Sequence, residues 1–184
     1  MTIKLKTSFL FGVLLSVFCW PMVAQNTFTI TGNNLKLTGS SSLVLNNTQF
    51  VNNGSFDAGT GTVVIAGNGT DVQSAISGTS ATTFYNLEIN KSSNGSQLQR
   101  AIQVDNELRM TLGNLDLNNN DLTLGTANGI IIGESETSHI TGASGGVVQK
   151  TVTLNAPTNI NPGNMGMVCN SSVNIGVLTI KRGH

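Results

Sequence analysis

The residues of this sequence that are best suited to catalysis or metal binding are its two histidines. His139 lies among serine, threonine and glutamate, and His184 is the last residue given. Imidazole can act as an acid, a base or a metal ligand near neutral pH, but each role needs partner side chains. The sequence contains no H-E-x-x-H, paired cysteine, G-x-S-x-G or phosphate-binding motif. It therefore favours His139 as a surface or corner residue, and it predicts neither catalytic residues nor enzyme activity.

The segment Asp116–Asp121 is the best candidate for a metal site. Its sequence, DLNNND, places oxygen ligands at alternate positions, as at the start of a calcium-binding loop. That loop needs glycine where Asp121 stands and glutamate where Ala127 stands. The G-G-x-G-x-D pattern that binds calcium between coils is also absent from the sequence. The segment is better interpreted as a corner whose asparagine amides bond along a stack, so the sequence predicts no metal and no cofactor.

Threonines at alternate positions offer a third chemistry, an outward row of hydroxyl groups like that of ice-binding proteins. Thr27, Thr29 and Thr31 form one row, and Thr151 and Thr153 form another. These rows are not sustained at one register over successive repeats. They are therefore better interpreted as ordinary β-branched residues on solvated strands.

The elements that must position these residues are short strands joined by corners. Between Leu108 and Gly125, three apolar pairs stand at i, i+2, so both members of a pair lie on one face of a strand. The pairs are Leu108 with Met110, Leu115 with Leu117, and Leu122 with Leu124. A leucine every seven residues would also suit a coiled coil, but Gly113 and the asparagines at 118–120 are unfavourable inside a helix.

A longer repeat extends over most of the chain. One apolar column, with steps of 21 to 23 residues, consists of Leu43, Val64, Leu87, Leu108, Ile130 and Val152. Three steps of seven or eight residues make one such period, as a three-sided β-solenoid requires. The sequence predicts an all-β fold, a right-handed parallel β-solenoid (three-sided β-helix) with coils of about 22 residues over residues 25–156. A β-sandwich of short alternating strands is the alternative.

The first residues have the layout of a secretory signal peptide. Lys4 and Lys6 precede an apolar run from Phe9 to Trp20, and cleavage is expected near Ala24. The run is shorter than the roughly 20 apolar residues that span a membrane. We therefore assign residues 1–24 to the signal peptide and expect no membrane span after its removal.

The last part of the sequence has a different residue pattern. Residues 157–184 begin with a looser stretch that holds Pro157 and Pro162, and residues 173–182 again have a strand pattern. No cap for the last coil is obvious in the sequence. We expect this end to be incomplete, with an open sheet edge.

Charge and cysteine content exclude several classes of protein. The nine Lys and Arg become seven without Lys4 and Lys6, against nine Asp and Glu, which gives a net charge of minus two. A basic surface for nucleic acid is therefore not expected. Cys19 falls in the leader, so the mature chain keeps Cys169 alone and cannot form an internal disulfide. We expect that thiol to be buried.

Several segments carry a resemblance to a known family. The runs 61–67, 72–78 and 83–90 resemble the repeats of secreted β-solenoid proteins of Bacteroidota, and 115–125 and 151–182 are similar to later segments of those proteins. The resemblance implies an adhesin-like protein, usually ending in a type IX secretion sorting domain. No such domain occurs in this sequence, so we expect a truncated product or a fragment.

Together these patterns predict an exported structural or adhesive module, secreted or at the cell surface, or periplasmic if no sorting signal follows. Its expected partners are a glycan or another surface protein. Two alternatives are a carbohydrate-active β-helix enzyme, either a polysaccharide lyase or a hydrolase, and an ice or crystal-surface binding protein. The enzyme would need clustered acids and aromatic platforms, and the sequence has one Tyr and one Trp, the latter in the leader.

Overall fold

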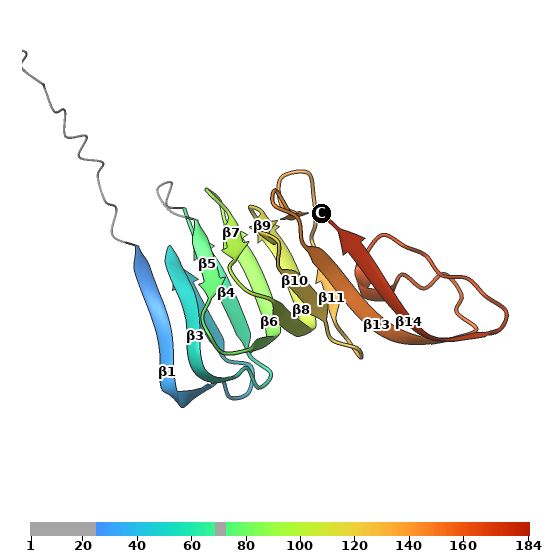
Figure 1. The fold of residues 1–184 in the computed structure, drawn as a ribbon, viewed down its shortest axis with the longest axis horizontal. Helices are drawn as coiled ribbons and strands as arrows, with labels where there is room; N and C mark the ends of the chain where they lie inside the picture. Colours follow the sequence, from blue (N-terminus) through green and yellow to red (C-terminus); the bar gives the residue numbers. More distant parts are fainter. Residues whose placement is uncertain (1–24, 69–72) are drawn as a thin grey trace, which may run out of the picture.

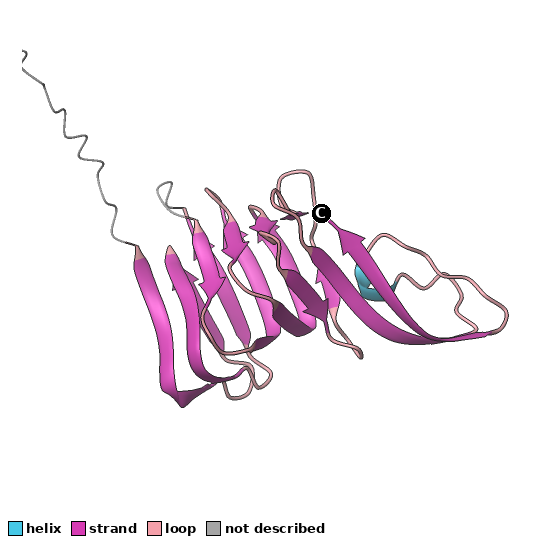
Figure 2. Cartoon of the chain, in the orientation of Figure 1, coloured by secondary structure: helices cyan, strands magenta, loops and turns pink. Residues whose placement is uncertain are grey.

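The computed structural model describes residues 25–68 and 73–184, and this part of the chain is built from strands, with a single 3-10 turn (Figures 1 and 2). The strands are β1 (Asn26–Lys36), β2 (Ser42–Asn46), β3 (Thr48–Asp57), β4 (Thr62–Gly67), β5 (Ser74–Ser77), β6 (Thr82–Lys91), β7 (Ser96–Leu98), β8 (Ile102–Leu112), β9 (Leu115–Asp116), β10 (Asp121–Leu124), β11 (Ile130–Ile132), β12 (Ile140–Thr141), β13 (Val147–Asn155) and β14 (Asn174–Gly183). The predicted signal peptide, residues 1–24, lies outside the described residues.

The strands stack in two sheets. One has the order β1-β3-β5-β7-β9-β12, and the other β14-β13-β10-β8-β6-β4-β2, with β11 also paired to β8. Pairing between consecutive coils is parallel throughout the described stack. The chain therefore forms the predicted β-solenoid, with about five turns of roughly 22 residues each.

Long strands turn a corner and so give the coil a third side. Along β6, Thr82 and Phe84 are buried before the bend, and Leu87 and Ile89 after it. The inward-facing positions thus change phase, and the pairing of β6 with β8 shifts register between Phe84 and Asn86. A bulge of this kind bends a strand and redirects its side chains. One turn of the stack therefore passes along β7, then the first half of β8, then its second half.

The core consists of apolar columns that run along the stack. In one column, ladder partners are Leu43, Val63, Leu87, Leu108 and Ile131, the last four fully buried. The predicted column was wrong by one residue at two positions, since Val64 is half-buried and Ile130 is exposed. Both residues lie in continuous apolar runs, where alternation does not fix which residues face inward.

The last strand of the stack leaves the parallel pattern. The first four residues of β13 pair in parallel with β10, whereas the whole strand pairs antiparallel with β14. Val152 lies opposite Leu178 and does not stack on Ile130, so its place in the predicted column was also wrong. In Figure 1, the far half of this hairpin extends beyond the coils.

The segment between β13 and β14 covers the end of the core. Its 3-10 turn, η1 (Pro162–Asn164), brings Met165 into the core, and the Asn164 amide donates to the carbonyl oxygen of Ile131 at 2.9 Å. Gly163 adopts a left-handed φ of 69°, and a Cβ there would lie 2.9 Å from Leu124 and 3.0 Å from Lys150. The last coil is thus capped by irregular backbone, which explains why no cap pattern was recognisable in the sequence.

Candidate functional site

The segment Asp116–Asp121 forms a corner in the structure. Asn118 and Asn119 both have left-handed backbones, and the Asn118 N–H donates to the Asp116 carboxylate at 3.0 Å. The side-chain amides of Asn118 and Asn120 each donate to the carbonyl oxygen of Leu98, one coil away, at 3.1 Å. The amides thus bond along the stack, as the corner interpretation predicts. Within residues 25–68 and 73–184, no group of three or more His, Cys, Asp and Glu could hold a metal ion.

A cluster of charged residues joins the loop after β11 to the end of β14. Arg182 donates two hydrogen bonds to the Glu134 carboxylate, at 2.8 and 2.9 Å, and a third to Nε2 of His184 at 3.1 Å. Glu134 also accepts a bond from the Ile140 backbone N–H at 3.1 Å. His139 lies in the same loop, its backbone N–H bound to the Asn114 side chain. The sequence did not reveal this cluster, because Glu134 and Arg182 are 48 positions apart.

The electrostatics of the cluster favour one charge state. Burial acts to raise the pKa of Glu134, but the bonds from Arg182 and from Ile140 outweigh it and hold that pKa below its usual value. Burial, together with the neighbouring charge of Arg182, lowers the pKa of His184. The cluster is therefore most stable with Glu134 ionised and His184 neutral. It fastens a loop to the last strand, and its groups already satisfy one another.

A polar hollow of about 410 Å3 lies along the corners of successive coils. Its wall is formed by Gln73, Ser92, Asn94, Gly95, Ser96, Gly113, Asn114, Asp116, Thr137 and Thr141. Two glycines allow the corners to stack closely, since a Cβ on Gly113 would lie 1.9 Å from the Lys91 carbonyl and one on Gly95 2.6 Å from that of Asn114. The hollow therefore presents amides, hydroxyls and one carboxylate, a surface suited to a ligand rich in hydroxyl groups.

The threonine rows do not continue across the coils. Thr27, Thr29 and Thr31 pair with Gln49, Val51 and Asn53 on β3. Thr151 and Thr153 lie opposite Thr179 and Val177 on β14. This pairing agrees with the interpretation of ordinary strand residues.

The sequence did not predict the burial of two lysines, and it predicted the wrong environment for the thiol. Lys150 is buried, and its Nζ donates to the carbonyl oxygens of Gly125 and Gly129 at 2.6 and 2.8 Å. Lys91 is buried as well, and its Nζ donates to the Asn47 side chain at 3.1 Å. Burial lowers the pKa of both amines. Cys169 is half-buried, so the expectation of a buried thiol was wrong.

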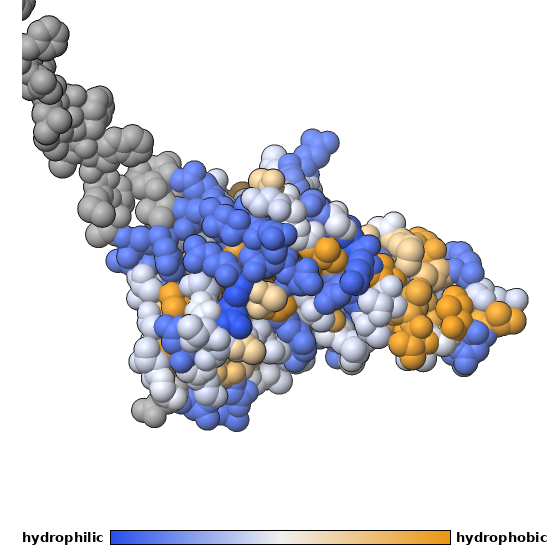
Figure 3. All heavy atoms as spheres, viewed as in Figure 1, coloured by the Kyte–Doolittle hydropathy of each residue, from blue (hydrophilic) through white to orange (hydrophobic). Residues whose placement is uncertain are grey.

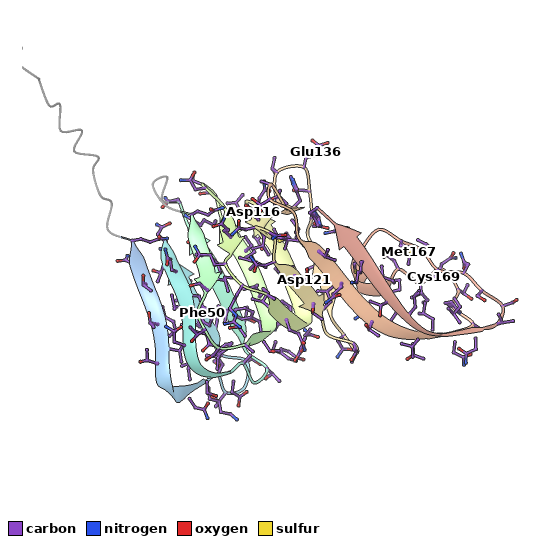
Figure 4. All side chains as sticks on the ribbon, in the orientation of Figure 1. Phe50, Asp116, Asp121, Glu136, Met167 and Cys169 are labelled. Carbon is purple, nitrogen blue, oxygen red and sulfur yellow. The ribbon has the colours of Figure 1, made fainter. Side chains whose placement is uncertain are left out.

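Apolar side chains are exposed mainly on the protruding hairpin. Six of them lie within residues 160–177, namely Ile160, Met167, Val168, Val173, Ile175 and Val177. Figure 3 shows apolar surface gathered there, while the face of the coils in the same view is largely polar. Figure 4 places Met167 and Cys169 in the segment that extends past the stack beside β14. We call these six residues the tip surface.

Comparisons with known proteins identify no relative of this chain. No protein-family model matches the chain, and no curated protein or solved structure is significantly similar to it. In the described ranges, no helix is long and apolar enough to cross a membrane.

Proposed function

We propose that this chain is an exported structural or adhesive module without catalytic activity, acting at the cell surface or in the extracellular space. The observation that carries the proposal is the polar hollow built from corners of successive coils. Such a surface repeats along the rod at the strand spacing of about 4.8 Å, so several weak contacts can be made side by side. A rod that presents repeated polar contacts is better suited to attachment than to catalysis.

The partner class that best fits the hollow is a glycan. Asn94, Asn114, Thr137 and Thr141 present amide and hydroxyl groups that can both donate and accept hydrogen bonds, which matches the hydroxyl groups of a sugar. The side chains of the wall are neutral apart from Asp116. A neutral polysaccharide is therefore favoured over an acidic one, because Asp116 would repel acidic groups.

Binding to a panel of neutral and acidic polysaccharides, followed by calorimetry on any that bind, tests this function. We expect a neutral glycan to bind, and the double variant Thr137→Val/Thr141→Val to weaken binding at least tenfold. Thr83→Val, which removes an exposed hydroxyl on β6, is the matched control and should bind as the parent does. No binding to any glycan or intact cell surface would refute the proposal. Release of shortened or unsaturated sugars would replace it with a carbohydrate-active enzyme.

A further inference from the structure

The protruding hairpin presents an outer face that no described part of the chain covers. Along β14, Val177 and Thr179 are exposed on this face, while Leu178 and Ile180 pack on the core. Ile175 is also exposed and lies at the register shift of the β13–β14 ladder. Val177 is 73% exposed, the largest exposure among the large apolar side chains of residues 25–68 and 73–184. Across the ladder, Thr153 lies opposite Val177. The same strand therefore has one buried apolar side and one exposed apolar side.

The area of the tip surface is large for a single apolar patch. Its six side chains expose on the order of 500 Å2, in the upper part of the range of about 300–600 Å2 for the largest apolar patch of a monomer. With the flanking threonines, a symmetric contact between two such surfaces would bury about 1,200 Å2 in total, the lower bound for a specific interface. The surface is thus large enough to hold two copies together.

Charge indicates which partner fits. Residues 151–180 contain no Asp, Glu, Lys, Arg or His. A charged partner would find no opposite charge on this segment to pair with. An identical uncharged surface meets no repulsion and loses no ionic hydration on contact. An apolar surface without charge is therefore complementary to itself, as a two-fold contact requires.

The shape of the hairpin supports the same partner. A hollow of about 420 Å3 lies beside β13, lined by Thr126, Ala127 and residues 151–153. The exposed row of β14 runs alongside, because Thr153 pairs with Val177 and the Thr151 and Thr179 hydroxyls bond at 2.9 Å. In a two-fold arrangement, the row of each copy would enter the hollow of the other. The contact then contains two identical row-and-hollow pairs, one from each copy.

We infer that two copies of this chain associate through the tip surface, with Val177 near the two-fold axis and the two rods pointing away from each other. This goes beyond the proposed function and does not depend on it, because the hollow for glycan lies on the coils. Two rods joined in this way would form a divalent particle with a glycan hollow on each arm.

Sedimentation of the full chain over a range of concentrations tests this inference. We expect a reversible change from 19.2 kDa to twice that mass, with no larger species. Val177→Asp should raise the dissociation constant at least tenfold, because it places a charge in the contact of both copies. Val44→Asp is the matched control, since Val44 on β2 is 58% exposed at the other end of the stack, and it should leave the constant unchanged.

Circular dichroism checks that each variant keeps its strands. If Val177→Asp does not fold, Val173→Asp serves instead, because Val173 is exposed and precedes β14. A monomer at every concentration overturns the inference. So does a dimer that resists both tip variants, a dimer dissociated by Val44→Asp, or a mass that rises steadily beyond two copies.

Discussion

Phe50 is the side chain on which the first coils converge. Its ring centroid lies 6.2 Å from that of Phe28, 5.5 Å from that of Phe56 and 5.4 Å from that of Phe84. Phe50→Ala should cost about 3–5 kcal/mol of unfolding free energy, because it leaves a cavity and removes three ring contacts. Urea denaturation measures this. Val44→Ala, on an outward position, should change the unfolding free energy by less than about 0.5 kcal/mol.

The asparagine corner gives a second test at the scale of single residues. Asn119 is exposed with a φ of 59°, so Asn119→Ala should cost about 1 kcal/mol through backbone strain, and Asn119→Gly should be nearly neutral. At Asn118 both substitutions should destabilise, because either one removes the amide bond to Leu98. Calorimetric melting with calcium and with chelator should give the same midpoint. A midpoint raised by calcium would contradict the corner interpretation.

Residue types along the chain predicted the inward-facing pairs between Leu108 and Leu124, all of which are buried. They did not predict which residue faces inward where apolar residues are consecutive. In Val63-Val64-Ile65, for example, both phases place apolar residues inside, and only the packing of neighbouring coils selects between them. The cluster around Arg182 was missed for another reason, since nothing local links Glu134 to a residue 48 positions later.

At the scale of elements, the fastening of the loop after β11 to β14 should depend on pH. The pKa of His184 is lowered in the folded chain, so stability should fall as the pH drops from about 6.5 towards that lower value. The pKa of Glu134 is also lowered, so its contribution is present above about pH 4.5 and is lost as the pH falls through the folded value. Titration of either group therefore lowers the stability of the folded chain as the pH falls.

Unfolding free energy measured between pH 3 and 8 checks these directions. His184→Gln should flatten the step below about pH 6.5, and Glu134→Gln the step below about pH 4.5. Because the ion pair is partly exposed, Glu134→Gln should cost only about 1 kcal/mol at neutral pH. Stability that rises on acidification would contradict both assignments.

The cap is the second element that can be tested. Met165 fills the end of the core under η1, so Met165→Ala should cost about 2–3 kcal/mol. Leu112, an exposed apolar residue on β8 outside the tip surface, is the control, and Leu112→Ala should be nearly neutral. Hydrogen exchange should show faster exchange in β11 and β13 of the Met165 variant and not in β1 or β3. Equal exchange in all strands would mean that the segment is not a cap.

Sequence patterns predicted these elements unevenly. The strand pattern at 173–182 corresponds to β14, but the same alternation serves parallel and antiparallel pairing, so the final hairpin could not be distinguished from a further coil. The cap was not recognisable, because its irregular backbone depends on Gly163 fitting between Leu124 and Lys150. Such contacts exist only after the stack has formed.

At the scale of the molecule, the chain is a rod whose interior is packed with apolar columns and whose proposed contacts with partners lie outside. The hollow on the coils and the tip surface on the hairpin lie on different parts of the rod. Attachment and pairing of copies can therefore be altered separately by mutation. Each depends on successive coils lying in the observed register.

Disulfide formation between outward positions tests that register most directly. Val44 pairs with Val64, and Val64 pairs with Glu88 on the next coil. Parallel neighbours lie about 4.8 Å apart, within the range of about 4.4–6.8 Å for bonded cysteines, whereas positions two coils apart do not. In a chain whose native cysteines are replaced by serine, Val44→Cys/Val64→Cys and Val64→Cys/Glu88→Cys should each oxidise to an internal disulfide. Val44→Cys/Glu88→Cys should stay reduced, and a disulfide in that pair alone would contradict the stack.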